Sequence, residues 1–385
     1  MRVYALKDTL QASFGGEWGN DCILGEGVAV LRTTNFTNTG NISYCNVVER
    51  DIADGKVQKK KLRVGDIILE KSGGTKNTPV GRVVYFDRSD KIYLCNNFTQ
   101  VLRPNLQIVD GKYLFYCLYA KYQFHVTDGL YNKTTGIQNL QMDRYFNLQI
   151  PVVDKEQQYK ICKQLDALRA AIEKKKQVLR KFEDLVKSQF IEMFGGGQYP
   201  ECPVKEFVAG KVESVRRRYK PKDQIRYVDI SSIDNKLNQM TGFTEYTLKD
   251  APSRAQQCIE RGDILVSTVR PNLRNIAMNT FDDDRMVASS GFCVLRATSC
   301  ERNYLFVALL LDNFSRKMSE LTTGANYPAI KDSDILEYRI PKPPIDRQIA
   351  FARFVEQSDK SKFRIKQSLE KLEKCYKALL QKYFG

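Results

Sequence analysis

The chain has 385 residues, enough for two domains, and its 61 Lys and Arg against 45 Asp and Glu give a net charge of +16 and a pI near 9.3. This basic balance is typical of proteins that bind nucleic acids. Ten scattered cysteines without a CxxC spacing and a single histidine argue against a zinc site, and no apolar run is long enough to span a bilayer, so we expect a soluble, cytoplasmic protein with reduced thiols.

Residues 1–149 have the pattern of a mixed α and β domain. Short runs of β-branched and aromatic residues are bounded by Gly, Asn, Asp and Pro, which is typical of strands. Apolar residues at 112–122 have helical spacing instead. The predicted strands are residues 28–31, 66–69, 82–86 and 92–95.

Residues 150–195 predict one long amphipathic helix. An apolar seam with heptad spacing runs from Ile161 to Met193. Pro151 precedes this seam and Gly195 follows it, which agrees with the preference of proline for helix starts and of glycine for helix ends.

Residues 196–339 repeat short motifs of the first domain in the same order. The spacing between matching motifs shortens gradually along the chain, as loop insertions and deletions in a duplicated fold would produce. We therefore expect a second mixed domain, with strands at 226–230, 263–266 and 292–296 and a helix at 301–320. The paired motifs are Gly65-Asp66-Ile67 with Gly262-Asp263-Ile264, Val101-Leu102-Arg103 with Val294-Leu295-Arg296, Tyr113-Leu114-Phe115 with Tyr304-Leu305-Phe306, and Thr134-Thr135-Gly136 with Thr322-Thr323-Gly324.

Residues 340–385 repeat residues 150–195 position by position, without a gap. Lys175 corresponds to Ile365, and Ile172 corresponds to Lys362, so each seam is apolar where the other is interrupted. The two helices therefore suit each other better than they suit copies of themselves. The residues expected at this helix-pair interface are Leu165, Leu168, Ile172, Leu179, Phe182, Val355, Ile365, Leu369, Leu372 and Leu379.

The connection between the two helices favours an antiparallel pair. A domain of about 145 residues has a radius of gyration of roughly 15 Å, whereas a helix of this length is on the order of 60 Å long. The second domain would have difficulty in returning the chain along the whole first helix. We therefore expect an α+β fold in which two similar mixed α/β domains are separated by two long α-helices that form an antiparallel coiled coil with a pseudo-twofold axis.

Motifs of common DNA-acting enzymes are missing from the sequence. There is no GxxxxGK[ST] pattern for nucleotide binding. The Lys342-Pro343-Pro344-Ile345 stretch lacks the flanking Asp or Asn and aromatic residue of amino-methyltransferases. His125 follows an aromatic-rich stretch, where an imidazole is more often packed or solvated than catalytic. We predict neither catalytic residues nor a metal site.

Loops that combine Arg or Lys with Gly and small polar residues are candidates for DNA contact, because a backbone can approach phosphates there and a side chain can reach base edges. Each loop alone is more often an ordinary solvated turn, but these loops recur at matching points of both domains. The charge runs at 59–61 and 216–218 are either solubilising faces or phosphate contacts. The candidate DNA-binding residues are Arg32, Thr33, Asn35, Lys71, Ser72, Gly73, Gly74, Thr75, Lys76, Thr135, Gly136, Gln138, Ser231, Ser267, Thr268, Arg270, Asn272, Arg274, Thr323, Gly324, Asn326 and Tyr327.

Taken together, these features resemble the specificity subunits of type I restriction-modification enzymes. The resemblance covers nearly the whole chain and depends on the domain-helix-domain-helix order. In two places the first copy departs from the second: Val152-Val153-Asp154 stands where the second has Lys342-Pro343-Pro344, and residues 96–98 replace residues 289–291. The motifs that carry the resemblance are Ile-Pro before each helix with Gln158 and Gln348 beyond it, the two Gly-Asp-Ile strands, residues 266–271 (Val-Ser-Thr-Val-Arg-Pro) and residues 290–296 (Ser-Gly-Phe-Cys-Val-Leu-Arg).

The resemblance implies a division into target-recognition domains at 1–149 and 196–339 and conserved spacer helices at 150–195 and 340–385. Each domain of that family reads one half of an asymmetric bipartite sequence in double-stranded DNA. The helices dock two methyltransferase (modification) subunits and, through them, restriction subunits. S-adenosylmethionine, ATP and Mg²⁺ are then expected on the partners, with no cofactor in this chain.

Two other hypotheses remain open from the sequence. One is a DNA-modifying or DNA-cleaving enzyme with an unrecognised active site. The other is a basic coiled-coil scaffold that binds DNA without sequence preference.

Overall fold

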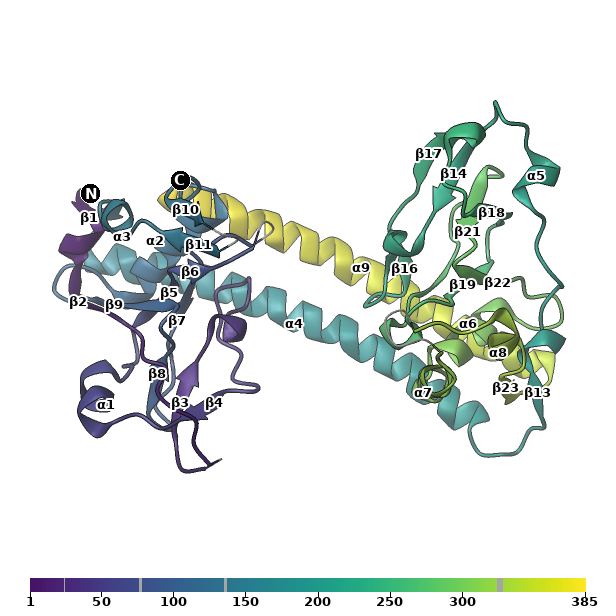
Figure 1. Ribbon diagram of the computed structural model, residues 1–385, viewed down its shortest axis with the longest axis horizontal. Coiled ribbons are helices and arrows are strands. Elements are labelled where there is room, and N and C mark those ends of the chain that lie inside the picture. The colour runs from purple at the N-terminus through teal and green to yellow at the C-terminus, as the bar shows by residue number, and fades with distance from the viewer. Residues whose placement is uncertain (24, 76–77, 135–136, 324–327) are drawn as a thin grey trace. The chain divides into compact units, whose positions relative to one another are not determined.

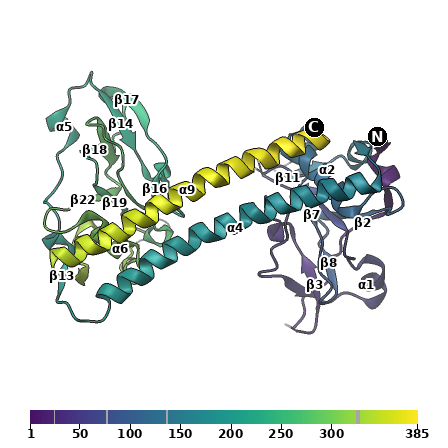
Figure 2. The same cartoon turned by 180° about the vertical axis from the view of Figure 1, so that it is seen from behind.

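The computed structural model describes residues 1–23, 25–75, 78–134, 137–323 and 328–385, and the chain forms two compact units (Figures 1 and 2). The first unit contains Met1–Lys175 and Ser368–Gly385, and the second contains Lys176–Gln367. Two 40-residue helices, α4 (Lys155–Phe194) and α9 (Ile345–Phe384), each contribute to both units. Within the described residues, no helix combines the length and the apolar character needed to cross a membrane.

The first unit is built on β5 (Ile67–Glu70), a strand that is buried on both faces. Successive side chains of a strand point to opposite faces. Ile67 and Leu69 accordingly lie in the core formed with α2 (Gly111–Gln123), and Ile68 lies in a second core with residues of β3 and β8. The central sheet has the strand order β2 (Leu10–Gly15), β9 (Thr99–Pro104), β5, β7 (Val83–Tyr85), and a second sheet has the order β4 (Val48–Arg50), β3 (Val28–Leu31), β8 (Tyr93–Cys95). Two smaller sheets have the orders β10 (Tyr131–Thr134), β11 (Ile137–Leu140), β6 (Ser72–Gly73) and β1 (Arg2–Ala5), β12 (Gln149–Val152). Helices α1 (Asp54–Lys60) and α3 (Met142–Phe146) lie outside these sheets.

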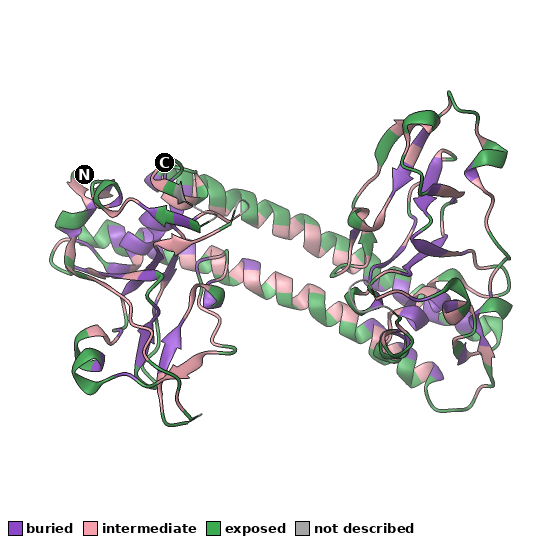
Figure 3. Ribbon diagram, in the orientation of Figure 1, coloured by how far each residue is buried: buried purple, intermediate pink, exposed green. Residues whose placement is uncertain are grey.

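The second unit repeats this arrangement around β19 (Ile264–Ser267). Ile264 and Val266 pack in the core with α6 (Arg302–Leu310), and Leu265 lies in a separate core. Buried residues gather in the central strands and in the helices packed on them, α2 and α6 (Figure 3). The central sheet has the strand order β15 (Ile233–Asp234), β16 (Gln239–Met240), β20 (Ile276–Met278), β19, β22 (Phe292–Leu295). A second sheet has the order β17 (Thr244–Thr247), β14 (Gln224–Val228), β21 (Met286–Ser289), β18 (Ala255–Cys258), and a third pairs β13 (Glu201–Pro203) with β23 (Arg339–Pro341). The unit also contains helices α5 (Val215–Arg218), α7 (Asp312–Glu320) and α8 (Asp332–Leu336).

Strand pairing confirms that the fold is duplicated. In the first unit β3 pairs antiparallel with β4 and parallel with β8, and in the second β14 pairs antiparallel with β17 and parallel with β21. Likewise β5 lies between β7 and β9, as β19 lies between β20 and β22.

The repeated Gly-Asp-Ile and Val-Leu-Arg motifs form, in each unit, an ion pair with a buried carboxylate. Arg103 donates from Nε and Nη2 to the two carboxylate oxygens of Asp66, at 2.8 and 2.7 Å. Arg296 makes the same fork to Asp263, also at 2.8 and 2.7 Å. Each carboxylate also accepts a hydrogen bond from a backbone N–H three residues before it. The ion pairs therefore join the start of β5 to β9 in the first unit, and the start of β19 to the end of β22 in the second.

The repeated Ile-Pro and Gln motifs attach each domain to the start of a long helix. Gln158 Oε1 accepts from the backbone N–H of Asp110, at 2.7 Å, where Asp110 caps the start of α2. In the second unit Gln348 Oε1 accepts from Glu301 N at 2.9 Å, where Glu301 caps α6. The hydroxyls of Tyr113 and Tyr304 donate to the carbonyls of Pro151 and Pro341, at 3.0 and 2.5 Å.

The predicted helix pair is confirmed within each unit. In the first unit Ile161 and Leu165, from the start of α4, share a core with Leu380 and Phe384, from the end of α9. In the second unit the residues that correspond to these in the repeat, Phe351 and Val355 with Phe190 and Phe194, share a core in the same way. The two helices therefore run in opposite directions in both units, and all ten residues predicted at the helix pair are buried or half-buried.

The predicted helix starts differ from the observed ones. Residues 149–152 and 339–341 are strands β12 and β23, which pair with β1 and β13, so the helices begin at Lys155 and Ile345. Because both units contain parts of both helices, the division of the chain into four sequence segments stays a prediction.

The predicted helix at 301–320 is wrong in one respect, because it is broken at Leu311. This residue is extended (φ −69°, ψ 150°) and separates α6 from α7. Asp312 and Asn313 follow it, and such side chains compete with the backbone for hydrogen bonds inside a helix. Arg274 fixes the start of α7 by donating to Asp312 Oδ1 at 2.6 Å and to Ser315 Oγ at 3.0 Å.

Candidate nucleic-acid interface

Two of the candidate loops of the first unit lie side by side. Ser72 and Gly73, in β6, pair with Asn139 and Gln138 of β11, so the loop after β5 meets the β10–β11 hairpin. Gln138 is buried, accepts from Val80 N at 3.1 Å and donates to Thr75 O at 3.3 Å. The two loops therefore form one surface rather than two independent turns.

The equivalent loops of the second unit are also brought together. Val269 and Thr323 both form bridges to Ala329. The backbone N–H of Arg270 donates to Pro328 O at 2.8 Å, and that of Ile330 donates to Thr268 O at 2.9 Å. As in the first unit, one loop follows the central strand and the other precedes a short helix, α8 here and α3 there.

The candidate DNA-binding residues differ in how far their side chains reach solvent. Thr75, Ser231, Arg270, Asn272 and Thr323 are exposed. The half-buried candidates are Arg32, Thr33, Lys71, Ser72, Gly73, Gly74 and Arg274. The buried candidates are Asn35, Gln138, Ser267 and Thr268. Six candidates lie outside the described residues: Lys76, Thr135, Gly136, Gly324, Asn326 and Tyr327.

The four buried candidates hold loops in shape. Asn35 donates to the carbonyls of Ser43 and Cys45 at 3.0 and 3.2 Å. Ser267 Oγ donates to Val269 O at 2.9 Å, and Thr268 Oγ1 donates to Gly291 O at 3.0 Å. A buried side chain that is already hydrogen-bonded inside its own domain cannot also reach DNA without leaving these partners. In this structure these residues, with Gln138, support the loops, and their direct contact with DNA stays a prediction.

A strained turn carries two of the exposed candidates of the second unit, Arg270 and Asn272. Arg270 and Arg274 have left-handed backbones, with φ of 49° and 54°, on either side of a 3-10 turn at Pro271–Leu273. This conformation is costly for a residue with a Cβ and is concentrated at functional positions. The Arg274 side chain is bound to Asp312 and Ser315, and its guanidinium lowers the pKa of the Asp312 carboxyl. The turn is thereby fixed against α7, and the Arg270 side chain lies at the surface.

The 32–46 loop, which contains Arg32, Thr33 and Asn35, is closed by its own hydrogen bonds. Arg32 Nη2 donates to Asn46 O at 3.0 Å across the base of the loop. Arg82 forms an ion pair with the buried Glu70 at 2.6 Å and donates to Thr33 O at 3.2 Å. Sequence patterns gave no signal for Arg82 and Glu70, because they meet the loop only through tertiary contacts.

The two charge runs are partly used within the protein. Lys60 forms an ion pair with Glu17 at 2.8 Å, and Arg218 forms one with Glu213 at 2.8 Å. Arg216 and Arg217 are exposed, so the second run keeps surface charge that could meet phosphate.

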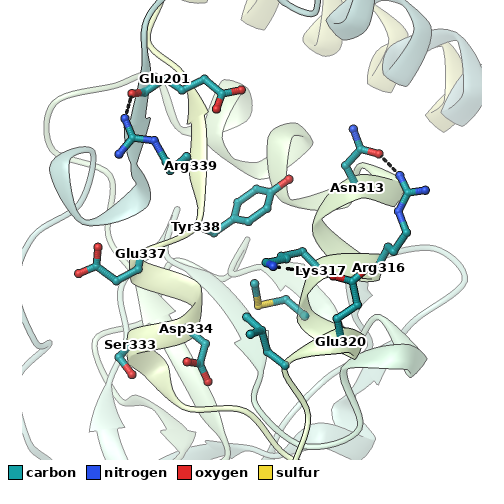
Figure 4. Close-up of a pocket in the computed structure, with 12 residues that line it drawn as sticks. Glu201, Asn313, Arg316, Lys317, Glu320, Ser333, Asp334, Glu337, Tyr338 and Arg339 are labelled. Atoms are coloured by element: carbon teal, nitrogen blue, oxygen red, sulfur yellow. Dashed lines mark hydrogen bonds and ion pairs between the residues drawn. The ribbon is translucent and has the colours of Figure 1, made fainter.

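A hollow and the thiols are two features of the described residues where reactive chemistry could be sought. A hollow of about 700 Å³ in the second unit lies between α7 and α8, and Tyr338 points into it (Figure 4). Its lining includes the hydrogen-bonded pair of Asn313 and Arg316. All ten cysteines are free and lie in the described part of the chain; Cys45 and Cys375 are exposed. Burial raises the pKa of Cys117 and Cys293 to about 12, which keeps these thiols protonated and poorly nucleophilic.

Comparisons with known proteins agree with the duplicated architecture. The chain is 23% identical over 401 residues to a putative type I restriction enzyme MjaX specificity subunit of Methanocaldococcus jannaschii, covering 98% of this chain and 92% of that one. It is 24% identical over 310 residues to the MjaVIII specificity subunit of the same organism, covering 72% and 70%. The fold is similar to the crystal structure of the type I restriction-modification S subunit from M. genitalium, with a TM-score of 0.56, 16% identity, and coverage of 100% and 96%.

The sequence model of one protein family matches both halves of the chain. The type I restriction modification DNA specificity domain is found twice, at residues 24–181 and 209–374. Each match contains one of the central strands, β5 or β19, and reaches into the long helix that follows its domain. These two matches include most of the chain, and the protein therefore belongs to the type I restriction modification DNA specificity domain family.

Proposed function

We propose that this chain is the non-catalytic subunit that selects a bipartite, asymmetric DNA sequence for a type I restriction-modification system. The observation that carries the proposal is the pairing of loops: in each unit the loop after the central strand lies against the loop before a short helix. A single chain with two such surfaces of different sequence is suited to reading two different half-sites. The net charge of +16 supports binding to the DNA backbone.

Within this proposal, exposed and half-buried loop residues make the contacts. Arg270 is suited to a guanine edge or a phosphate, since its guanidinium carries a fork of donors. Asn272 is suited to an adenine edge. In the first unit the contacts with bases or phosphates are made by Arg32, Lys71 and Thr75. The proposed surface also includes the six candidates outside the described residues: Lys76, Thr135, Gly136, Gly324, Asn326 and Tyr327.

The proposal also includes partners that supply the chemistry. Helices α4 and α9 would dock two modification subunits, which bind S-adenosylmethionine, and through them restriction subunits, which use ATP and Mg²⁺. This chain would work with them in the cytoplasm, and its own residues would bind DNA and set the separation of the half-sites.

Exchanging residues 1–149 for the corresponding domain of a related chain is expected to change one half of the recognised sequence and to leave the other half unchanged. Each unit has its own cores and its own loop pair, so neither surface depends on the other. The measurement is sequencing of modified bases in DNA treated with the reconstituted complex and S-adenosylmethionine. A change in both halves would contradict the proposal.

Replacing Arg270 by alanine is expected to weaken specific DNA binding by about 1–3 kcal/mol. If the contact is to a phosphate, the slope of affinity against salt concentration falls by about one unit as well. Titration of fluorescent target DNA at several salt concentrations measures both. Arg261→Ala is the matched control, because Arg261 is an exposed arginine of the same unit that forms an ion pair with Asp282 at 3.5 Å. Equal losses in the two variants would mean that Arg270 contributes only general charge.

A further inference from the structure

The 32–46 loop is attached at its tip to two helices of the first unit. Gly40 (φ 77°) lies so close to α2 that an added Cβ would come within 2.7 Å of the Phe115 ring. The hydroxyl of Tyr119 donates to Asn38 O at 3.4 Å. The second attachment comes from α4, where Arg169 reaches the neighbouring residues of the loop.

Arg169 makes a directional bridge to the loop. Its Nη2 donates to the backbone carbonyl of Thr39 at 2.7 Å and also to Oδ1 of Asn41. The guanidinium lies over the rings of Phe115 and Tyr116, 5.4 and 5.6 Å from their centroids. A planar cation held on two aromatic faces points its donors in a fixed direction, which a lysine ammonium cannot reproduce.

The arginine is itself held by groups of the first unit. The hydroxyl of Tyr116 donates to Asp166 Oδ1 at 2.6 Å, one helical turn before Arg169. Lys112, from α2, forms an ion pair with the same carboxylate at 2.9 Å. These contacts fix the Tyr116 ring and α4 relative to each other, so the position of the guanidinium follows from α2 and α4 together.

The loop and the helix are not packed continuously around this bridge. A hollow of about 450 Å³ lies beside it and is lined by residues that include Asn41, Tyr44, Arg88 and Glu173. Close packing transmits position through many contacts. On the α2 side Gly40 is packed in this way, whereas on the α4 side the directional hydrogen bonds of Arg169 connect the helix to Thr39 and Asn41. Loss of these bonds is therefore expected to let the loop shift toward the hollow without unfolding the domain.

The second unit has different contacts at the equivalent position. The residue that corresponds to Arg169 in the repeated helix is Asp359, which forms an ion pair with Lys362 of its own helix at 2.6 Å. About two turns after Asp359, Lys366 donates to Gln239 Oε1, in β16, at 3.0 Å. The arginine bridge thus belongs to the first unit, and its removal should affect that unit alone.

We propose that Arg169 is a positioning residue for sequence reading by the first unit: it sets the tip of the 32–46 loop, residues 38–41, against the long helix. The inference rests on the proposed function, because it assumes that this loop faces DNA. The base of the loop is fixed by Arg82 and Asn46. Its tip is oriented by Arg169, so loss of the bridge is expected to move the exposed outer part of the loop, at Asn38, relative to Arg32 and Thr33 at the fixed base.

The test uses the full chain assembled with its modification subunits, plasmid DNA with random inserts and S-adenosylmethionine, followed by sequencing of modified bases. Arg169→Met is expected to lower discrimination between correct and incorrect bases about tenfold in one half-site, as loss of a charged hydrogen bond would do, and to leave the other half-site unchanged. Asn41→Ala should relax the same half-site more weakly. Arg180→Met is the matched control, because Arg180 is an exposed arginine of the same helix.

A rescue variant separates positioning from general loss of structure. Arg169→Lys alone is expected to relax the half-site, and Arg169→Lys combined with Asn41→Asp is expected to restore selectivity through a new ion pair across the same gap. The inference is overturned if Arg169→Met keeps the wild-type motif, relaxes both half-sites equally, or abolishes modification together with Asn41→Ala. If the wild-type complex gives no two-part motif, the proposed function fails, independently of any result at Arg169.

Discussion

Replacing Asp66 by alanine is expected to lower the free energy of unfolding of the first unit by about 3–5 kcal/mol, because it leaves the buried guanidinium of Arg103 without its carboxylate. The two side chains are 2% and 12% exposed, so water can replace little of the lost interaction. The carboxylate also accepts from Arg63 N, which loses its partner as well. Denaturant unfolding followed by hydrogen exchange in peptides from β5 and β9 measures the effect.

The second unit provides the comparison for this variant. Asp263→Ala is expected to cost less than Asp66→Ala, since Arg296 is 28% exposed and has a second carboxylate partner, Glu260, at 2.9 Å. An equal or larger loss in the second unit would mean that burial of the arginine does not control the cost. Peptides from β19 and β22 report this unit separately.

Phe194→Ala is expected to destabilise the second unit by about 3–5 kcal/mol, through the loss of buried surface and the cavity left behind. The ring is 1% exposed and lies 5.0 Å from Tyr304, 5.0 Å from Phe190 and 5.6 Å from Phe351, measured between centroids. It thus joins the end of α4 to the start of α9 and to α6. Hydrogen exchange at these three helix segments should increase together.

Two matched variants show whether packing is the cause. Phe194→Leu keeps most of the volume and should cost less than about 1.5 kcal/mol. Ile191→Ala removes an apolar side chain from the same helical turn, but Ile191 is 56% exposed, so its effect should be small. A loss at Ile191 as large as that at Phe194 would show that helix propensity, rather than the aromatic cluster, determines stability there.

Much of the fold could be predicted because the chain repeats itself. The constant offset between residues 150–195 and 340–385 identified both long helices and their pairing, and the drifting motifs identified the two domains. The structure gives those motifs a physical meaning that spacing alone could not, since the partners Asp66 and Arg103 are 37 residues apart in sequence. Phe190 and Leu380 were missed, because a straight α-helix drifts away from a strict heptad seam over the length of α4 and α9.

The candidate site was less predictable, because a polar loop residue looks the same in sequence whether it faces water or the loop interior. Asn35 and Thr268 are turned inward by carbonyls 8 and 23 residues away. The left-handed backbone at Arg270 and Arg274 has no signature in residue type, since arginine has no special preference for it. Arg169 lies in a helix with a heptad pattern, and periodicity does not reveal which loop of a neighbouring domain a flanking cation will touch.

The two exposed cysteines of the first unit allow a distance within it to be measured with attached probes, without introducing new cysteines. Cys45, in the 32–46 loop, and Cys375, in α9, are the two exposed cysteines, and both belong to the first unit. A maleimide or nitroxide reagent should label this natural pair before the buried thiols, whose raised pKa and lack of access slow alkylation. The separation of two such probes, followed by pulsed dipolar spectroscopy, would report movement of the base of the 32–46 loop against α9 when DNA is added.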